Sequence, residues 1–386
     1  MLRYLTAGES HGPCLTAVVE GIPANLEVLA AEIDTFLKRR QSGYGRGGRM
    51  AIEQDHVRIL SGVRWGRTLG SPITLSIENR DWVNWTQTMS ARPEDRDETK
   101  SMTWPRPGHA DLNGVVKYRQ RDVRTILERS SARETSIRVA VGALCQILLR
   151  NLGMEFASYV TEIGGVAARD DSQDYVSRRR LAEKSCCGTF DLEAETAMKA
   201  RIDAASAAGD SLGGVVEVVV LGLPVGLGSH VQWDRRLDAR LAAAVMSIQA
   251  FKGVEIGLGF DAARLPGSKV HDEIGREAGR GFFRFTNNAG GLEGGMTTGE
   301  PLVIRGAMKP IPTLRQPLHT VDIVSGAPHE ASKERSDVCA VPAAAVVAEA
   351  VVSIEIANAV LEKFGGDTME DLEASVQKFR EYTAQL

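Results

Sequence analysis

Two histidines in this sequence lie in glycine-flanked turns, where a side chain can act on a bound molecule. His11 stands in residues 8–12 (GESHG), and His109 stands in residues 106–111 (RPGHAD). Glycine lets the backbone approach a ligand closely, and histidine exchanges a proton near neutral pH. Each motif alone is more typical of a turn with a structural or surface histidine. No HExxH or paired-histidine spacing accompanies them, so we expect no metal site.

Arginine-rich loops accompany the histidines and suit an anionic ligand. The chain holds 35 Arg and 11 Lys, and arginine can bind carboxylate or phosphate with two parallel hydrogen bonds. Residues 39–49 (RRQSGYGRGGR) carry four arginines but lack the GK[ST] of a P-loop. This segment is compatible with a helix C-terminus with solvated charges, an RNA contact or a clamp for phosphate or carboxylate groups. The motif alone does not decide among these.

A capped helix start offers a further anion site. Ser131 and Glu134 form an S-x-x-E capping box, with Arg129 and Arg133 beside it. A helix N-terminus with hydroxyls and cations nearby binds anions readily. Asp111 is expected to cap the helix that follows it.

Two loops late in the chain complete the set. Residues 287–296 (NNAGGLEGGM) are too rich in glycine for a packed element, and their backbone N–H groups can receive a planar or anionic ligand. Residues 309–314 (KPIPTL) form a stiff loop with one cation. Asp337 can act as a general base or pair with Arg335. Together, these motifs suit an enzyme that acts on a small polyanion with histidines as proton donors.

Helices and strands alternate along the chain, which places these motifs on the connections between elements. Helical spacing predicts helices at 29–40, 133–152, 237–251 and 342–364, and strand-like runs lie at 16–20, 73–77, 214–221 and 302–304. Glycine-rich or polar loops are expected at 42–48, 253–259, 287–295 and 170–180. No linker divides the chain. We therefore expect an α/β or α+β architecture in one large domain, residues 1–386.

Composition limits the class of protein. The 386 residues are 43% hydrophobic and 25% charged, with a net charge of −4, which excludes a disordered tail or a coiled coil and argues against a broad basic surface for nucleic acid. The five cysteines form no CxxC pair and indicate a reducing compartment. The first residues lack the apolar run of a signal peptide, and the apolar stretch at 341–352 is broken by Glu349 and is shorter than a membrane span. We expect a cytoplasmic protein that binds no membrane.

The motifs, in this order, closely resemble those of the chorismate synthase family. The resemblance covers nearly the whole chain and rests on RYLTAGESHGP, RRQSGYGRGGRM, SGVRWGRTLGSPI, MTWPRPGHADLNG, ERSSARET, GGMTTGEP, KPIPTL and ERSDVCAVPA. It implies a β-α-β sandwich, usually a homotetramer. It also implies the last step of the shikimate pathway, in which 5-enolpyruvylshikimate-3-phosphate loses phosphate and a C6 hydrogen in a 1,4-anti elimination that gives chorismate. The family requires reduced FMN, with NADPH involved only indirectly, for flavin reduction. An external flavin reductase is the expected partner.

The resemblance also assigns roles to residues. His11 is the acid that protonates the departing phosphate, His109 is a donor near the flavin, and Asp337 assists proton removal. Substrate contacts carry over to Ser10, Arg40, Arg46, Arg49, Arg106, Ser131, Arg133 and Arg335, and NADP is attached to the positions of Arg40 and Arg46. FMN contacts carry over to Arg129, Ser130, Ser131, Gln249, Ala250, Gly294, Lys309, Pro310, Ile311, Pro312, Thr313 and Arg335.

Two other functions remain as alternatives. An Arg/Gly-loop RNA-binding module is disfavoured by the acidic balance of charges and by the lack of interleaved aromatic residues near Tyr44. A flavin-independent lyase acting on a sugar phosphate would turn over without FMN.

Overall fold

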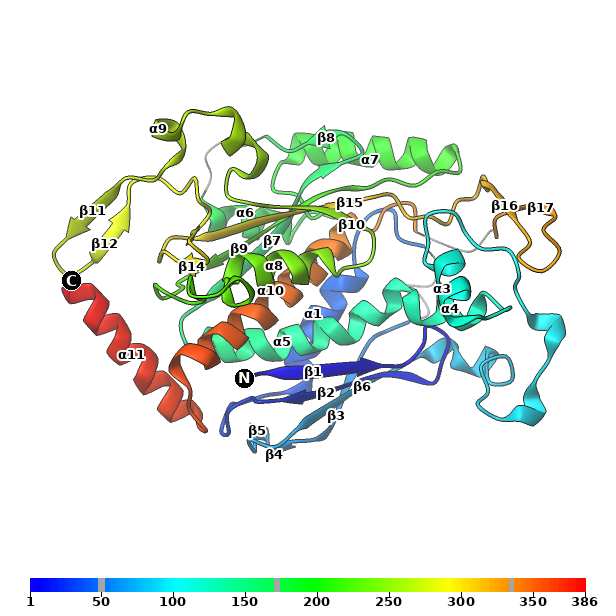
Figure 1. Ribbon diagram of the computed structural model, residues 1–386, viewed down its shortest axis with the longest axis horizontal. Coiled ribbons are helices and arrows are strands. Elements are labelled where there is room, and N and C mark those ends of the chain that lie inside the picture. The colour runs from blue at the N-terminus through cyan, green and yellow to red at the C-terminus, as the bar shows by residue number, and fades with distance from the viewer. Residues whose placement is uncertain (48–52, 170–173, 333–336) are drawn as a thin grey trace.

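Two antiparallel sheets enclose a layer of helices in the computed structural model, which describes residues 1–47, 53–169, 174–332 and 337–386 (Figure 1). The first sheet has the strand order β1-β2-β6-β3, and every neighbouring pair is antiparallel. Its strands contain the runs expected at 16–20 and 73–77. They are β1 (Arg3–Ala7), β2 (Cys14–Glu20), β3 (Val57–Ser61) and β6 (Ile73–Glu78).

The second sheet has the order β10-β15-β9-β7-β8 and is also antiparallel. The loop expected at 253–259 was wrong in its first half, because residues 251–256 pair with β15. Val254 and Ile256 pack against the core as the period-two apolar face of a strand, a signal that the nearby glycines obscured. The strands are β7 (Glu155–Ile163), β8 (Val166–Ala167), β9 (Gly214–Leu221), β10 (Phe251–Ile256) and β15 (Leu302–Met308).

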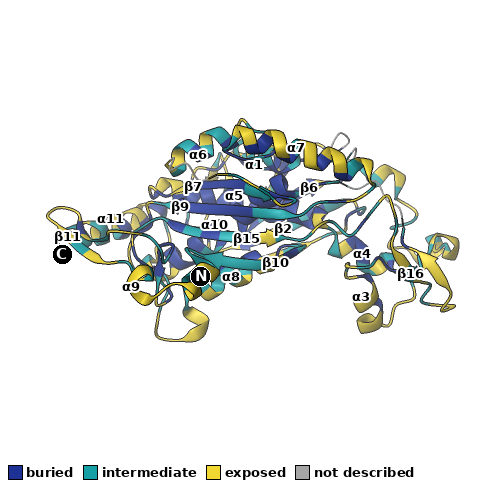
Figure 2. Ribbon diagram, turned by 90° about the horizontal axis from the view of Figure 1, so that it is seen from above, coloured by how far each residue is buried: buried dark blue, intermediate teal, exposed yellow. Residues whose placement is uncertain are grey.

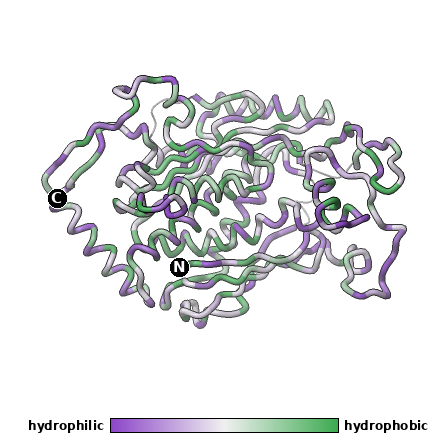
Figure 3. The backbone as a smooth tube through the Cα atoms, in the orientation of Figure 1, coloured by the Kyte–Doolittle hydropathy of each residue, from purple (hydrophilic) through white to green (hydrophobic). Residues whose placement is uncertain are grey.

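The helical layer fills the space between the sheets. Helix α5 packs on β2 and β6, α10 packs on β7 and β9, and the two helices pack on each other. Buried residues concentrate in this layer and on the sheet faces that cover it (Figure 2), and the hydrophobic segments follow the same central elements (Figure 3). This arrangement is the α+β sandwich expected. The layer contains α1 (Ala30–Gln41), α5 (Thr135–Asn151), α8 (Leu237–Met246) and α10 (Val341–Phe364).

Helix α10 is longer than the apolar stretch noted in the sequence. Its 24 residues have the length and hydropathy of a membrane span, but 89% of its most apolar window is buried inside the protein. The sequence analysis was therefore wrong to expect that this segment is too short to span a membrane. Burial between sheet and helices explains the apolar composition.

Two helix predictions differ from the structure at their ends. The segment expected to start at 133 opens with a short 3₁₀ turn, Ala132–Glu134, before α5 begins. The helix expected to reach 251 ends at Met246 because Ala250 adopts a left-handed conformation (φ 70°) and Phe251 starts β10.

Smaller elements surround the sandwich. Helix α6 covers β7 on the outer face of the second sheet, so the surface excursion expected at 170–180 contains part of a helix in its described portion, while 170–173 lie outside the described residues. Beyond the layers lie α3 (Asp111–Tyr118), α4 (Arg124–Ser130), α6 (Tyr175–Ala182), α7 (Leu192–Ala207), α9 (Gly267–Val270) and α11 (Met369–Gln385), together with the strand pairs β4 (Val63–Arg64) and β5 (Arg67–Thr68), β11 (Ile274–Glu277) and β12 (Gly281–Arg284), β13 (Leu292–Glu293) and β14 (Met296–Thr297), and β16 (His319–Val321) and β17 (Pro328–Glu330).

Candidate active site

One cavity of about 510 Å³ gathers most of the residues singled out in the sequence. It lies where several elements end: after β1, α1 and β15, and before α3, α5 and α10. A volume in this range suits a small-molecule or cofactor site. The predicted residues that line it are Ser10, His11, Arg40, Arg46, Arg106, His109, Ser130, Ser131, Arg133, Gln249, Ala250, Lys309, Ile311, Pro312, Thr313 and Asp337.

Three predicted flavin contacts do not line this cavity. The guanidinium of Arg129 donates to the carbonyl oxygens of Gly8, at 3.1 Å, and Thr6, at 3.0 Å, so it braces the end of β1. Gly294 forms the turn between β13 and β14 with a φ of +58°. Pro310 is also absent from the lining. Two further predicted residues, Arg49 and Arg335, lie outside the described residues.

His11 is held by a buried carboxylate on α4. Its ring nitrogen Nδ1 lies 2.9 Å from Oε2 of Glu128, and its backbone N–H donates to the same oxygen at 2.9 Å. The Arg124 guanidinium donates to the other oxygen at 3.0 Å. Burial alone would raise the pKa of Glu128, but hydrogen bonds from His11 and the charges of His11 and Arg124 hold it below its ordinary value. The ring also stacks on Trp85, with centroids 4.0 Å apart.

His109 has a matching partner in Asp111. Its Nδ1 lies 2.5 Å from Oδ1 of Asp111, while Oδ2 accepts hydrogen bonds from the backbone N–H (3.0 Å) and the Nε (2.9 Å) of Arg106. Burial opposes ionisation, but bonds from His109 and Arg106 lower the pKa of Asp111 to about 2. Asp111 begins α3 without capping it, so the expected cap was wrong. Its side chain instead joins the histidine to the arginine.

Arg40 is the cation best placed to meet an anion. It is buried, and it donates to Oγ1 of Thr135 at 3.0 Å and to the carbonyl of Ala132 at 2.9 Å. Its third nitrogen, NH1, is buried without a hydrogen-bond partner among the described residues. Burial lowers the pKa of Arg40 to about 9, which Asp55 opposes and Arg133 reinforces. NH1 also lies 3.7 Å from Oδ2 of the buried Asp55, an ion pair without a hydrogen bond. A buried cation that lines the cavity suits an anionic ligand.

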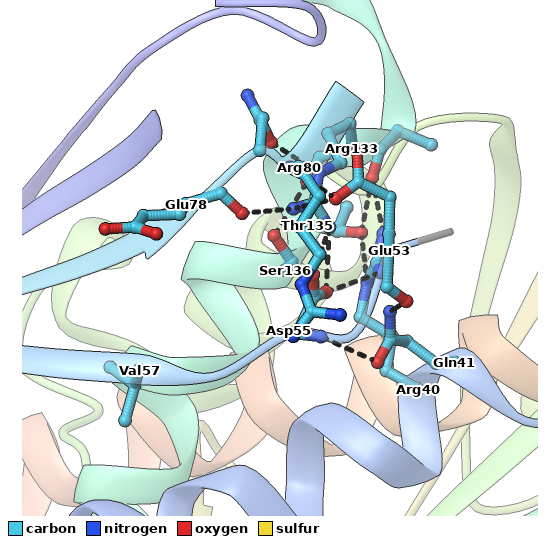
Figure 4. A network of polar contacts seen from close by, with 12 residues as sticks. Arg40, Gln41, Glu53, Asp55, Val57, Glu78, Arg80, Arg133, Thr135 and Ser136 are labelled. Carbon is cyan, nitrogen blue, oxygen red and sulfur yellow. Dashed lines mark hydrogen bonds and ion pairs between the residues drawn. The ribbon is translucent and has the colours of Figure 1, made fainter. Parts of the chain in front are cut away.

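Arg133 lines the cavity, but its guanidinium is engaged in a network behind the wall (Figure 4). It donates to both oxygens of Asp55, at 2.6 and 2.8 Å, and to Oδ1 of Asn79 at 2.9 Å. Glu53 lies 3.7 Å away. This pairing ties the start of α5 to the segment before β3. Arg133 was predicted to bind the substrate, but the hydrogen bonds that its guanidinium makes in the structure are to other residues of the protein.

Asp337 lines the same cavity from the segment that leads into α10. It accepts hydrogen bonds from NH1 of Arg46, at 2.6 Å, and from the backbone N–H of Gly47, at 2.6 Å. These bonds fix the carboxylate against the loop that follows α1. Asp337, predicted as a base, is thus paired with Arg46, predicted to bind an anionic group of the substrate.

The capping box at the start of α5 forms only in part. The hydroxyl of Ser131 accepts from the backbone N–H of Arg133, at 3.3 Å. The Glu134 carboxylate makes no hydrogen bond with the Ser131 backbone N–H. It accepts hydrogen bonds from the Thr6 hydroxyl, at 3.0 Å, and from the Gln249 amide, at 3.3 Å. Its side chain thus connects the first strand to the far wall of the cavity.

The residues that face this space offer an apolar wall for a flat ring and cations for a small anion. One wall is apolar and made of small side chains on α10, with Met308, Ile248 and Leu127 nearby, which suits a flat ring. Buried Oε1 of Gln249 has no hydrogen-bond partner among the described residues, so it is open to a donor on a ligand. Lys309 reaches across to the carbonyl of Gly108 at 2.5 Å. The residues of this wall are Ala340, which precedes α10, and Ala343, Ala344 and Val347 of α10.

Sequence reasoning missed the partners of both histidines. Glu128 lies 117 positions from His11, and nothing in the spacing links them, although Glu128 opens the ERSSARET motif. Asp111 lies two positions after His109, a proximity that could have indicated the pair. Nothing in the sequence indicated that Trp85 stacks on His11 or that Asp55 pairs with Arg133.

Comparisons with known proteins agree over the full length. A family model described as chorismate synthase matches residues 2–361. A chorismate synthase of Syntrophotalea carbinolica is 66% identical over 381 residues, covering 99% of this chain and 98% of that protein. That of Geobacter sulfurreducens is 61% identical over 389 residues, covering 99% of each. A solved structure titled "Crystal Structure of Chorismate Synthase" superposes with a TM-score of 0.82 at 46% identity and covers 100% of this chain and 99% of that one.

Proposed function

This chain belongs to the chorismate synthase family, and we propose that the cavity described above is where it converts 5-enolpyruvylshikimate-3-phosphate into chorismate beside a bound reduced FMN. The enzyme is a carbon–oxygen lyase of aromatic biosynthesis. The RNA-binding and flavin-independent alternatives receive no support from the relatives.

One observation carries the assignment of the site. Two histidines, each with Nδ1 held by a buried carboxylate, line one cavity together with Arg40, Arg46 and Arg106. Acid–base groups and cations are what the elimination of phosphate from a polyanion requires.

The substrate carries one phosphate and two carboxylates, which the arginines are suited to bind. Arg40 lines the cavity, and its NH1, which forms an ion pair with Asp55 at 3.7 Å, makes no hydrogen bond to a described residue. Arg46 and Arg106 are held in place by Asp337 and Asp111, at 2.6 and 2.9 Å. Ser10 and Ser131 line the same space as hydroxyl donors or acceptors.

The chemistry that reduced FMN would supply here is a transient donation of electron density as phosphate leaves. Gln249, Ala250, Lys309, Ile311, Pro312 and Thr313 form the wall that would hold it, with Ser130 and Ser131 opposite.

Protons are moved by the chain's own residues. His11 donates a proton from Nε2 to the departing phosphate, because Nδ1 is already engaged by Glu128. His109 is a donor on the flavin side, and Asp337 assists removal of the C6 hydrogen. The C3–O bond to phosphate and the C6–H bond break, a new double bond forms, and one phosphate and one proton leave.

The proposal includes the oligomeric state of the protein and the source of its reduced flavin. The resemblance to the family supports a homotetramer in the cytoplasm that receives reduced flavin from an external reductase. NADPH then acts only on that reductase.

The test is an anaerobic incubation of the protein with reduced FMN and 5-enolpyruvylshikimate-3-phosphate. Chorismate absorbance and inorganic phosphate should rise in equal amounts. A folded protein that releases neither would contradict the proposed function, and phosphate release without chorismate would point to a different lyase reaction.

A further inference from the structure

Glu128 and Asp111 have no assigned part in the reaction, yet each contacts one of the two cavity histidines. Each carboxylate is buried, with 3% and 0% of its residue surface exposed. The histidines come from different segments, and the carboxylates from different helices, α4 and α3. A shared arrangement at two separate places suggests a shared role.

The two arrangements share three kinds of contact. Each carboxylate bonds Nδ1 of its histidine, the guanidinium of one arginine and one backbone N–H: those of Arg124 and His11 for Glu128, and both from Arg106 for Asp111. They differ in that the Arg106 guanidinium also lies 3.1 Å from Nδ1 and 3.4 Å from Nε2 of His109. In both, the bonds lower the pKa of the carboxyl against the effect of burial. Each carboxylate is therefore ionised at neutral pH and can only accept hydrogen bonds.

An acceptor at Nδ1 determines where a neutral imidazole carries its hydrogen. Because an ionised carboxylate cannot donate, Nδ1 of each ring must hold the proton of that bond, and Nε2 carries the lone pair. No described residue accepts a hydrogen bond from Nε2 of His11, and the ring lines the cavity. The exchangeable proton is therefore gained and lost at Nε2, toward the ligand.

Ring rotation at His11 is restricted as well. Trp85 stacks on one face, with an interplanar angle of 26°, and Arg124 lies 5.0 Å from the indole centroid. The same arginine thus contacts both the carboxylate and the stacking partner. A ring fixed in this way can release a proton and accept the next one without turning over.

We propose that Glu128 and Asp111 are positioning residues that hold His11 and His109 in the Nδ1–H tautomer, and that Nε2 of His11 is thereby presented to the ligand. This inference rests on the proposed function for its kinetic consequence, but its structural consequence exists in the ligand-free protein.

The first test is nitrogen-15 NMR of the ligand-free protein with labelled histidine, at alkaline pH where the ring is neutral. The His11 signals are identified by their loss in His11→Gln. We expect a protonated Nδ1 and a bare Nε2. A wild-type His11 that carries its hydrogen on Nε2 would overturn the proposal, whatever any variant does.

The second test uses Glu128→Gln, which keeps the shape of the side chain. Its amide nitrogen cannot accept, so one of the three donors around Glu128 is left without an acceptor. We expect a mixture of His11 tautomers and a kcat lowered about 10- to 100-fold with supplied reduced FMN, with KM little changed. Retention of the single tautomer or of the wild-type kcat would contradict the positioning role, and so would a change confined to KM.

Glu217→Gln is the matched control. Glu217 is a buried carboxylate of β9 that accepts from the Tyr159 hydroxyl at 2.6 Å, away from the cavity. It should leave the His11 tautomer and kcat unchanged. If wild-type protein shows the expected tautomer but forms no chorismate, the proposed function fails while the positioning of His11 stands.

Discussion

At the scale of single residues, each histidine of the cavity depends on a carboxylate that holds its Nδ1 and an arginine that holds the carboxylate. Nδ1 of His11 lies 2.9 Å from Oε2 of Glu128, and the Arg124 guanidinium donates to Oε1 of Glu128 at 3.0 Å. This chain of contacts leaves Nε2 as the atom that meets the ligand. At His11, the geometry thus limits acid–base chemistry to Nε2.

Replacement of either histidine should be costly to catalysis. We expect His11→Ala and His109→Ala each to lower kcat by ~10²–10⁴, the usual contribution of a general acid or base, measured anaerobically with reduced FMN. His230→Ala, an exposed position outside the cavity, is the control and should behave as wild type. A wild-type rate in either cavity variant would remove that residue from the mechanism.

Residue types and turns selected His11, His109 and the arginine-rich loops, because chemistry-bearing side chains flanked by glycine stand out in a sequence. Gln249 and Ala250 were predicted only through the resemblance to the family. What could not be foreseen is which partner each would take. Arg133 resembles a ligand clamp in the sequence, but its bonds go to Asp55 and Asn79. Such long-range pairing is set by the fold, since Asp55 lies 78 positions away.

At the scale of elements, the site depends on how closely α5 and α10 cross. A Cβ added to Gly142 would lie 2.4 Å from the Cβ of Ala350, so the helices meet with almost no side chain between them. Both helices begin at the cavity and supply its walls. Their separation therefore sets the width of the site.

Gly142→Ala should destabilise the protein although alanine favours helices. The methyl group forces the helices apart, and we expect a loss of ~1–3 kcal/mol in the free energy of unfolding, the usual cost of overpacking. Denaturant unfolding measures it. Gly267→Ala in α9 is the control, because its added Cβ would lie 3.4 Å or more from any neighbour. Equal stability of both variants would argue against this tight crossing.

Periodicity predicted the long elements of the core well, since helical spacing gave α1 and α10 to within one residue at each end. It failed where backbone conformation overrides composition. The left-handed Ala250 ends the segment after α8, and strand β10 forms through backbone bonds despite its neighbouring glycines.

At the scale of the whole molecule, an ion pair around the buried Glu349 joins three helices of the central layer to the second sheet. Glu349 of α10 accepts two hydrogen bonds from Arg39 of α1, both at 2.9 Å, and others from Ser158 of β7, at 2.5 Å, and Gln146 of α5, at 3.1 Å. Burial by itself would raise the pKa of Glu349, but these partners lower it to about 2. The ion pair thereby fixes the C-terminal end of α1, which also carries the cavity residue Arg40.

Glu349→Gln should lower the free energy of unfolding at neutral pH by about 3 kcal/mol, because it leaves the Arg39 charge unpaired. The pKa of Glu349 is lowered on folding from its ordinary 4.5 to about 2, so its stabilisation is present above pH 4.5 and is lost as the pH falls toward 2. The difference between wild type and variant should shrink over that window, as followed by urea unfolding. A difference independent of pH would contradict this assignment.

The exposed pair of Arg3 and Glu20 provides the control for that experiment. Glu20→Gln should change stability little, because solvent screens the pair.

Flavin supply is the second property of the whole molecule that can be tested. We expect purified protein given oxidised FMN and NADPH to make no chorismate under anaerobic conditions. Addition of a separate flavin reductase should start turnover. Turnover driven by NADPH alone would show that the chain reduces its own flavin.

The central claim is that this cavity forms chorismate only with reduced flavin. The most direct measurement is anaerobic turnover of 5-enolpyruvylshikimate-3-phosphate in three parallel samples, with dithionite-reduced FMN, with oxidised FMN and with none. We predict chorismate absorbance in the first sample only. Equal rates without flavin, or no product from folded protein in any sample, would contradict the account.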